Sequence, residues 1–331
     1  MTPITLVLTQ RDVARLVDLR IARRVVVAAL RSAARGQTVM PPKIYLPLPS
    51  GDDFRAMPAY LKHPSACGVK WVNVHAGNPR RGLPSVMAVI IMSDPATGVP
   101  LAVMDGLLIT KLRTAAAAAV AAQALARPDS CVVGLVGCGA QADAQLLALA
   151  QVFRLSHAKV WGFRLGEAEQ FCRMVRRLLP GVRFQSCATI ESTVRDTDIL
   201  VTLTPSRRPL VKREWLAPGV HINAVGADAP GKQELDPGIL PQALVVVDDR
   251  EQAVHAGEIN VPISRGLFAP RKIHATLGEV LIGRRPGRRS ARQWTVFDST
   301  GLATHDMALG FQVVQRARRR GLGHRVSLFV P

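Results

Sequence analysis

The feature that most constrains the fold of this chain is the segment Cys131–Ala142, which reads Cys-Val-Val-Gly-Leu-Val-Gly-Cys-Gly-Ala-Gln-Ala. Its apolar run predicts a buried strand, and the glycine spacing that follows predicts a tight turn into a helix. Gly137 would allow the turn, Gly139 would let the backbone approach a pyrophosphate, and Ala142 would keep the helix close to the sheet. The helix N-terminus would offer N–H groups to phosphate oxygens. We therefore expect a dinucleotide site here; the alternative is a glycine turn without a ligand.

Beyond this turn, apolar strand patterns alternate with helical patterns. Strands are expected at 131–136, 158–163, 182–187, 198–203, 220–225, 244–248 and 294–298, and helices at 140–152, 166–179 and 189–195. Such alternation is typical of a doubly wound parallel sheet. The sequence therefore predicts an α/β fold with a Rossmann sheet.

The first third of the chain has a different pattern. We expect a strand at Ile4–Leu8, a helix at Arg11–Leu30 and further strands at 68–75, 85–92 and 99–104, the last two forming a hairpin through the turn at Asp94–Gly98. This pattern predicts a second, α+β domain with a mainly antiparallel sheet. An alanine-rich helix at 115–126 would link the domains, and a final helix at 304–320 would return to the first. The expected division is 1–113 with 302–331, and 114–301.

Composition limits the classes of protein to consider. Apolar residues make up 48% of 331 residues, which supports a sizeable core, and no stretch reaches the length of a membrane span. The N-terminus lacks a signal-peptide pattern, so a soluble cytoplasmic protein is expected. Five scattered cysteines indicate reduced thiols and no metal site.

The formal net charge of +19 comes partly from arginines gathered at 284–292 and 316–325. Nucleic-acid binding is one interpretation, and a solvated basic surface is the other. No aromatic residues interleave with the arginines and no nucleic-acid motif is present. We therefore favour the basic surface.

Candidate catalytic groups lie far upstream of the glycine turn. Lys70 shares one strand face with Val72 and Val74, and burial on an apolar face would lower its pKa and make it a proton donor and acceptor. The alternative is an edge lysine whose ammonium reaches water. Arg55 and Arg113 stand in apolar surroundings, where a guanidinium would grip a substrate carboxylate or form a structural ion pair. Lys43, after two prolines, is a further candidate.

In the second domain, candidates follow the predicted strands. Asp228 could orient a water, an amine or a lysine, and Lys232 could meet a phosphate or carboxamide group. The second Rossmann strand ends at Gly162-Phe163-Arg164, where an NAD enzyme commonly has an acid. Because no carboxylate stands there to repel a 2′-phosphate, NADP(H) is favoured over NAD(H).

Together these segments make the chain resemble the ornithine cyclodeaminase/mu-crystallin family, and within it the archaeal-type alanine dehydrogenase branch. The resembling segments span nearly the whole chain in family order and include MPPKIYL (40–46), GVKWVNVHAGNP (68–79), VGCGAQA (136–142), HINAVGADAPGKQELD (221–236), VVVDDREQAVHAGEIN (246–260) and VFDSTGLA (296–303). One departure concerns Gly162, where those dehydrogenases have an acid and the NADPH-using relatives have an asparagine.

The resemblance implies a homodimer formed by the first domain. It implies that Lys70 transfers protons, that Arg55 and Arg113 hold the substrate carboxylate with Lys43 nearby, and that Arg113 also meets the cofactor. It further implies an NAD(P) site lined by Gly137, Gly139, Ala140, Gln141, Gly162, Phe163, Arg164, Thr204, Asn223, Ala224, Val225, Lys232 and Ser299. The expected reaction is reversible oxidative deamination of a small L-amino acid, alanine first. The alternatives are a ketimine or imino-acid reductase, an ornithine cyclodeaminase, and a protein that binds NADPH and a small ligand without turnover.

Overall fold

The chain divides into two compact units in this computed structural model, which describes residues 3–75 and 77–329. The first unit comprises Met1–Arg113 with Leu302–Pro331, and the second comprises Thr114–Gly301. Helix α3 (Leu107–Leu125) begins in the first unit and ends in the second. Its alanine run is buried on all sides, as the small side chains allow. The functional roles expected for the two units stay predictions.

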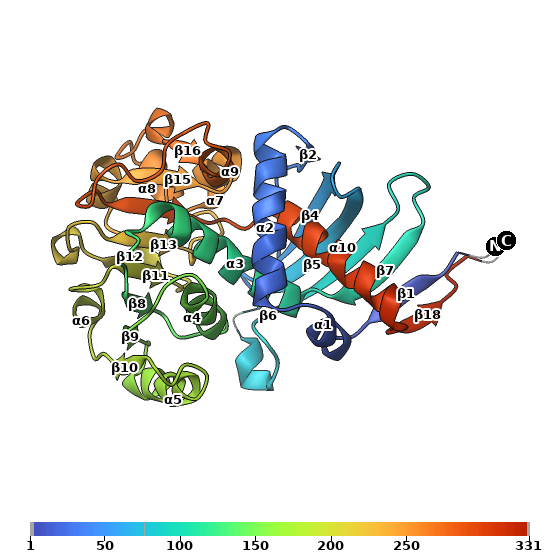
Figure 1. The fold of residues 1–331 in the computed structure, drawn as a ribbon, viewed down its shortest axis with the longest axis horizontal. Coiled ribbons are helices and arrows are strands. Elements are labelled where there is room, and N and C mark those ends of the chain that lie inside the picture. The colour runs from blue at the N-terminus through green and yellow to red at the C-terminus, as the bar shows by residue number, and fades with distance from the viewer. Residues whose placement is uncertain (1–2, 76, 330–331) are drawn as a thin grey trace. The chain divides into compact units, whose positions relative to one another are not determined.

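The first unit is built on an eight-stranded, mainly antiparallel sheet (Figure 1). Its strand order is β18-β1-β7-β6-β5-β4-β2, with β3 paired to β4. The strands are β1 (Thr5–Leu8), β2 (Thr38–Val39), β3 (Ile44–Pro47), β4 (Asp53–Leu61), β5 (Ala66–Val74), β6 (Val86–Ser93), β7 (Pro100–Asp105) and β18 (His324–Val326). The predicted hairpin is confirmed, since β6 and β7 pair antiparallel. Among the strand pairs that the structure describes in this sheet, only β1–β7 is parallel.

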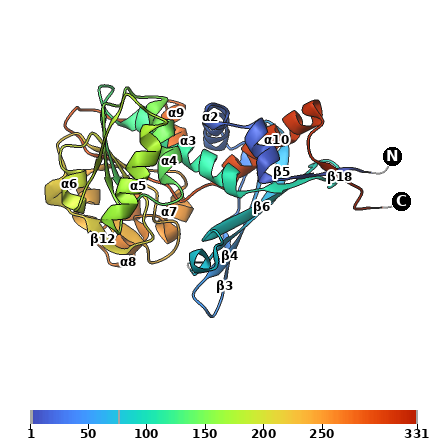
Figure 2. The same cartoon turned by 90° about the horizontal axis from the view of Figure 1, so that it is seen from below.

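Helices cover one face of this sheet. They are α1 (Gln10–Leu16), α2 (Leu19–Ala34) and α10 (Ala303–Arg320), and a 3₁₀ turn lies at Asn78–Arg81. The prediction of one helix over 11–30 is wrong, because the Asp18 side chain accepts a hydrogen bond from the Ile21 N–H at 2.8 Å and starts a second helix. The final helix α10 packs on β4, β5 and β6 and against α2 (Figure 2). Side chains on this face of the sheet are therefore buried beneath α10.

The second unit has the predicted doubly wound parallel sheet. Its order is β10-β9-β8-β11-β13-β17-β15-β16, and every recorded pair in it is parallel. The strands are β8 (Val132–Val136), β9 (His157–Trp161), β10 (Arg183–Ser186), β11 (Ile199–Thr202), β13 (His221–Ala224), β15 (Leu244–Val247), β16 (Ala275–Thr276) and β17 (Thr295–Asp298). The order of strands along the chain reverses between β8 and β11. Ligands bind sheets of this kind at such a switch point, outside the carboxyl ends of the strands.

Helices and a small second sheet complete this unit. The helices are α4 (Ala142–Ala150), α5 (Leu165–Arg176), α6 (Ile190–Val194), α7 (Arg250–Ala256), α8 (Asn260–Ser264) and α9 (Leu277–Leu281), with 3₁₀ turns at Arg213–Trp215, Pro237–Gln242 and Pro270–Lys272. The sequence did not predict the two-stranded sheet of β12 (Arg207–Val211) and β14 (Gln233–Leu235). Separate apolar clusters form on the two faces of the main sheet, as expected for strands buried on both sides. No helix among the described residues is long and apolar enough to span a bilayer.

Some of the arginines that give the chain its positive net charge have a structural role. Arg288 is half-buried, and its guanidinium donates to the carbonyl oxygen of Leu125 at 2.6 Å and to the Thr295 hydroxyl at 3.1 Å. In the first unit, Arg316 and Arg320 donate to backbone carbonyls of Leu16 and Arg15. These contacts explain three of the clustered arginines without a nucleic-acid partner.

Candidate active site

The first unit holds a buried cluster of two cations around one carboxylate. Lys70 Nζ lies 2.8 Å from Asp306 Oδ2, and Arg113 Nε lies 3.1 Å from Asp306 Oδ1. Asp306 is fully buried in the first turn of α10, where the helix dipole stabilises a carboxylate. Lys70 is 1% exposed on β5, between β4 and β6, so the alternative of an edge lysine is excluded.

The surroundings of Lys70 lower its pKa to about 7, as the sequence predicts in direction. Burial is the largest cause, because it disfavours the charged ammonium, and the positive charges of Arg113 and Lys43 act in the same sense. Asp306 opposes them. Since the unfolded lysine binds its proton more tightly, this group makes the free energy of unfolding rise with pH between about 7 and 10.5. Lys70 can therefore exchange a proton near neutral pH, as a general acid or base must.

Arg55 lies on the same buried face as Lys70, on the neighbouring strand. Its Nε donates to Asp53 Oδ1 at 2.7 Å, and its guanidinium stands over the Tyr45 ring at 5.3 Å. Lys43 precedes β3, which pairs with β4. Both predicted arginines thus have an acidic partner in the structure, and Lys70 and Arg113 share the single carboxylate of Asp306. This excess of cations can attract an anionic substrate.

Two residues of this cluster were not predicted from the sequence. One is Asp306. The other is His305, which is 1% exposed, has both ring nitrogens without a hydrogen-bond partner among the described residues, and has its pKa lowered to about 3, mainly by burial. The available signal was a histidine and an acid within the otherwise apolar start of the final helix.

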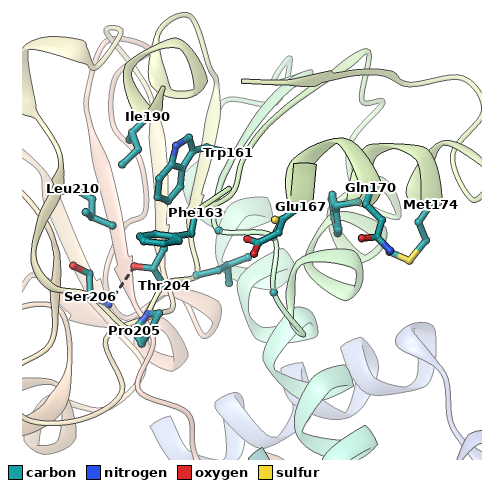
Figure 3. Close-up of a pocket in the computed structure, with 15 residues that line it drawn as sticks. Trp161, Phe163, Glu167, Gln170, Met174, Ile190, Thr204, Pro205, Ser206 and Leu210 are labelled. Carbon is teal, nitrogen blue, oxygen red and sulfur yellow. Dashed lines mark hydrogen bonds between the residues drawn. The ribbon is translucent and has the colours of Figure 1, made fainter. Parts of the chain in front are cut away.

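The second unit contains a cavity of about 1150 Å³ at the carboxyl ends of β8, β9 and β11. Figure 3 shows Trp161 and Phe163 from the end of β9 facing Ile190 and Leu210, with Thr204, Pro205 and Ser206 along one side. The walls also include three residues of the glycine turn, namely Gly137, Cys138 and Gly139. The cavity lies at the switch point of the sheet, where a dinucleotide is expected.

The glycine turn fits a dinucleotide in three respects. Gly137 has a φ of +109°, which only glycine adopts readily. The space beside Gly139 is open, since a Cβ there would meet nothing within 4 Å. Gln141 Oε1, just before α4, is buried and has no hydrogen-bond partner among the described residues, so it could accept a hydrogen bond from a ribose hydroxyl. Gly137 and Gly139 leave room for the pyrophosphate.

The residues expected to choose between NAD and NADP are only partly in this cavity. Phe163 lines it, and Arg164 is exposed beside it but is not part of its wall. A Cβ at Gly162 would lie 2.6 Å from Cys138 Sγ, so the thiol occupies the space that a side chain at 162 would need. The Glu167 side chain, which was not among the predicted site residues, also lines the cavity (Figure 3).

Other predicted residues of the second unit lie at strand ends outside the cavity wall. Lys232 Nζ lies 2.5 Å from Asp228 Oδ1, so these two candidates form an ion pair. The Asn223 side chain is buried and bonds to His221 and to the Ala118 carbonyl. Ser299 is also buried, at the end of β17. Ala140, Ala224 and Val225 likewise do not line the cavity, and the cofactor contacts expected for this group stay predictions.

These features define a two-unit α/β protein whose second unit has a dinucleotide-binding topology. The family model for the ornithine cyclodeaminase/mu-crystallin family matches residues 4–321. The alanine dehydrogenase of Archaeoglobus fulgidus is 46% identical over 98% of this chain and 99% of its own length. An archaeal alanine dehydrogenase dimer with bound NAD superposes with a TM-score of 0.94 and 47% identity, covering 98% of this chain and 100% of the other.

A third relative is the Δ1-pyrroline-2-carboxylate reductase of Thermococcus litoralis, solved with NADH and L-proline. Its TM-score is 0.94 and its identity 33%, over 97% of this chain and 100% of the other. The chain belongs to the ornithine cyclodeaminase/mu-crystallin family. The predicted family and fold are thereby confirmed.

The cluster predicts how Lys70 responds when Asp306 loses its charge. In an Asp306→Asn variant, Lys70 loses the carboxylate that favours its ammonium form, so its pKa should fall below about 7. Breaking a buried pair should also lower the free energy of unfolding by about 3–5 kcal/mol. NMR titration of the lysine side-chain carbons and urea unfolding measure the two effects. An unchanged Lys70 titration would contradict the shared-carboxylate geometry.

Proposed function

We propose that this chain is an NAD(P)-dependent amino-acid dehydrogenase that interconverts L-alanine with pyruvate and ammonia. The observation that carries the proposal is the buried Lys70 with a pKa of about 7, beside Arg113 and their shared Asp306. The close similarity to alanine dehydrogenases over nearly the full length supports the choice of alanine. The cavity in the second unit supports the nicotinamide cofactor.

In the proposed mechanism, Arg55 and Arg113 bind the substrate carboxylate. Arg113 uses only its Nε towards Asp306, which leaves its terminal nitrogens for a ligand, and a guanidinium can hold a carboxylate with two parallel hydrogen bonds. Arg55 is oriented by Asp53 and by the Tyr45 ring. Lys43 adds positive charge near Lys70, whose pKa it lowers. Fixing the carboxylate orients the α-carbon for reaction.

Lys70 would move the protons. A bound nicotinamide supplies the chemistry of accepting or returning the α-carbon hydride. Water then attacks the imino carbon, and neutral Lys70 Nζ takes a proton from that water and passes it to the departing ammonia. Asp306 stabilises the ammonium form in between. Since the neutral lysine is the base, the rate of oxidative deamination should rise with pH through about 7.

A second candidate is reduction of imino acids, because a relative of closely similar fold is a Δ1-pyrroline-2-carboxylate reductase. The assay that separates the two follows the absorbance of reduced nicotinamide with pyruvate plus ammonia, and then with cyclic imines. Faster turnover of cyclic imines would favour the reductase. Turnover of neither would favour a binding protein without useful catalysis.

The role of Lys70 predicts the outcome of its removal. A Lys70→Ala variant should lose at least about a thousandfold in kcat, a typical contribution of a positioned acid–base group, while dinucleotide binding by the second unit is kept. Steady-state kinetics and a fluorescence titration with NADPH measure the two. Lys62→Ala, on the exposed turn after β4, serves as the control and should keep wild-type kcat. Full activity in Lys70→Ala would remove Lys70 from the mechanism.

We propose NADP(H) as the preferred cofactor. The supporting observation is that Gly162 places no carboxylate at the end of β9, and the Cys138 thiol occupies the space for one. Arg164 follows on the exposed side, where it could meet a 2′-phosphate. The Glu167 carboxylate opposes this choice, although it accepts a hydrogen bond from the Arg164 N–H at 3.4 Å as a helix cap.

Two variants with opposite expected effects test the cofactor proposal. Arg164→Ala should lower the NADPH-to-NADH ratio of kcat/KM by about tenfold, the value of one charge-assisted hydrogen bond. Glu167→Gln should raise that ratio, because it removes a carboxylate from the cavity wall. The proposal would be contradicted if the wild-type protein preferred NADH and Arg164→Ala left the NADPH-to-NADH ratio of kcat/KM unchanged. The cavity would then bind the ribose without a 2′-phosphate.

We also propose that the protein is a homodimer, joined through the open face of the first sheet. Opposite α10, this face carries large apolar side chains that are about two-fifths exposed, among them Trp71, Val89 and Ile91. A continuous apolar sheet face of this kind is typical of an interface. One related structure is a dimer. A cytoplasmic location, expected from the sequence, stays a prediction.

The dimer predicts a charge-sensitive interface. Val89→Glu places a carboxylate at the centre of the apolar face and should convert the dimer to a monomer in sedimentation velocity. Leu178→Glu alters an exposed apolar side chain of the second unit and should leave the dimer intact. A wild-type monomer, or a Val89→Glu dimer of unchanged affinity, would refute this interface.

A further inference from the structure

Three carboxylates in the described part of the second unit are fully buried, and the proposed reaction does not use them. They are Asp298 at the end of β17, Glu258 between α7 and α8, and Glu234 on β14, and all three are fully buried. Together they form what we call the carboxylate series. No lysine, arginine or histidine forms an ion pair with Glu234 or Glu258 in the described part of the chain. Such groups are costly to bury, so their hydrogen bonds need an explanation.

Each carboxylate of the series binds the backbone of the segment that carries the next one. Asp298 accepts hydrogen bonds from the Glu258 and Ile259 N–H groups at 2.9 and 3.2 Å. Glu258 in turn accepts from the Glu234 N–H at 2.9 Å and from the Leu235 N–H at 2.7 Å. The series therefore links the end of a central strand to β14 through hydrogen bonds from backbone N–H groups to side-chain carboxylates.

The last member, Glu234, acts on the wall of the dinucleotide cavity. Its Oε1 accepts from both the Thr204 N–H and the Thr204 hydroxyl, each at 2.7 Å. Its Oε2 accepts from the Gly226 N–H at 3.0 Å. Thr204, Pro205 and Ser206 form one wall of the cavity, so a single carboxylate holds the base of that wall to the loop after β13.

The local sequence is adapted to this contact. A Cβ at Gly226 would lie 2.4 Å from Glu234 Oε2 and 2.2 Å from the Thr204 carbonyl oxygen, so only glycine allows the carboxylate so close. β14 pairs with β12, which begins directly after the wall segment. Burial raises the pKa of Glu234 to about 7, and the Thr204 and Gly226 donors act in the opposite sense because they favour its ionised form.

We propose that Glu234 is a positioning residue that sets the shape of the cavity wall at Thr204–Ser206 for the dinucleotide, with Asp298 and Glu258 holding Glu234 in place. The inference rests on the proposed function in one respect, that this cavity receives a nicotinamide dinucleotide. An amide at position 234 would turn its NH2 group towards either Thr204 or Gly226, where only an acceptor fits. The wall would then lose at least one of its three contacts.

The test uses the full-length protein and measures binding directly. Fluorescence titration with NADPH and NADH gives Kd, and hydrogen exchange without ligand reports on the amides of Thr204 and Gly226. Glu234→Gln should raise Kd by about tenfold, the effect of one lost hydrogen bond to a charged group, and should speed exchange at both amides. Glu234→Asp keeps the charge and should recover part of the affinity; it also serves as the test variant if Glu234→Gln does not fold.

Asp198→Asn is the matched control. Asp198 also accepts two backbone hydrogen bonds, from the Cys131 and Val132 N–H groups at 2.9 Å, but at the amino ends of β8 and β11, on the opposite edge of the sheet. Its variant should speed exchange there and leave Kd unchanged. A wild-type Kd in Glu234→Gln, or equal weakening in Asp198→Asn, would overturn the inference. Failure of the unaltered protein to bind either dinucleotide would instead overturn the proposed function.

Discussion

The arrangement of the first unit depends on one shared carboxylate. Asp306 faces two cations that would otherwise be buried together, and the pair of contacts ties β5 and α3 to α10. One carboxylate for two cations leaves a net positive charge in a place with little water. Burial, and after it the charge of Arg113, lower the pKa of Lys70, and the imbalance gives Arg113 capacity for a further anion. The contacts of the Asp306 carboxylate therefore affect both the stability of the fold and the proton affinity of Lys70.

The second unit achieves order by another means. Its central strands are buried on both faces. At the strand ends, side-chain carboxylates accept hydrogen bonds from backbone N–H groups. Asp198 does this at the amino ends of the strands, and Glu234 does it near their carboxyl ends. The cavity at the carboxyl edge is consequently bordered by segments that side chains hold in place, and a ligand would meet a wall that is already formed.

The sequence was sufficient to predict the parallel sheet, the hairpin and the returning helix, because each leaves a local pattern of apolar residues. The burial of Lys70 was one of two interpretations of its strand, and the strand order decides between them. The sequence could not predict Asp306, whose partners lie 193 and 236 residues away. The same holds for the closeness of Cys138 and Gly162, which only the packed turn creates. The helix break at Asp18 did leave a local signal, an N-cap within an amphipathic pattern, and the apolar periodicity concealed it.

The position of α10 has a consequence for synthesis. A ribosome releases β5 and Arg113 long before residue 306, with the whole second unit made in between. During that interval Lys70 and Arg113 lack their carboxylate, and the sheet face that α10 covers is open. The first unit can complete its core only after the chain end emerges, whereas the second unit is continuous and can fold as it appears. A chain cut short before α10 would thus leave the first unit without Asp306 and with one face of its sheet uncovered.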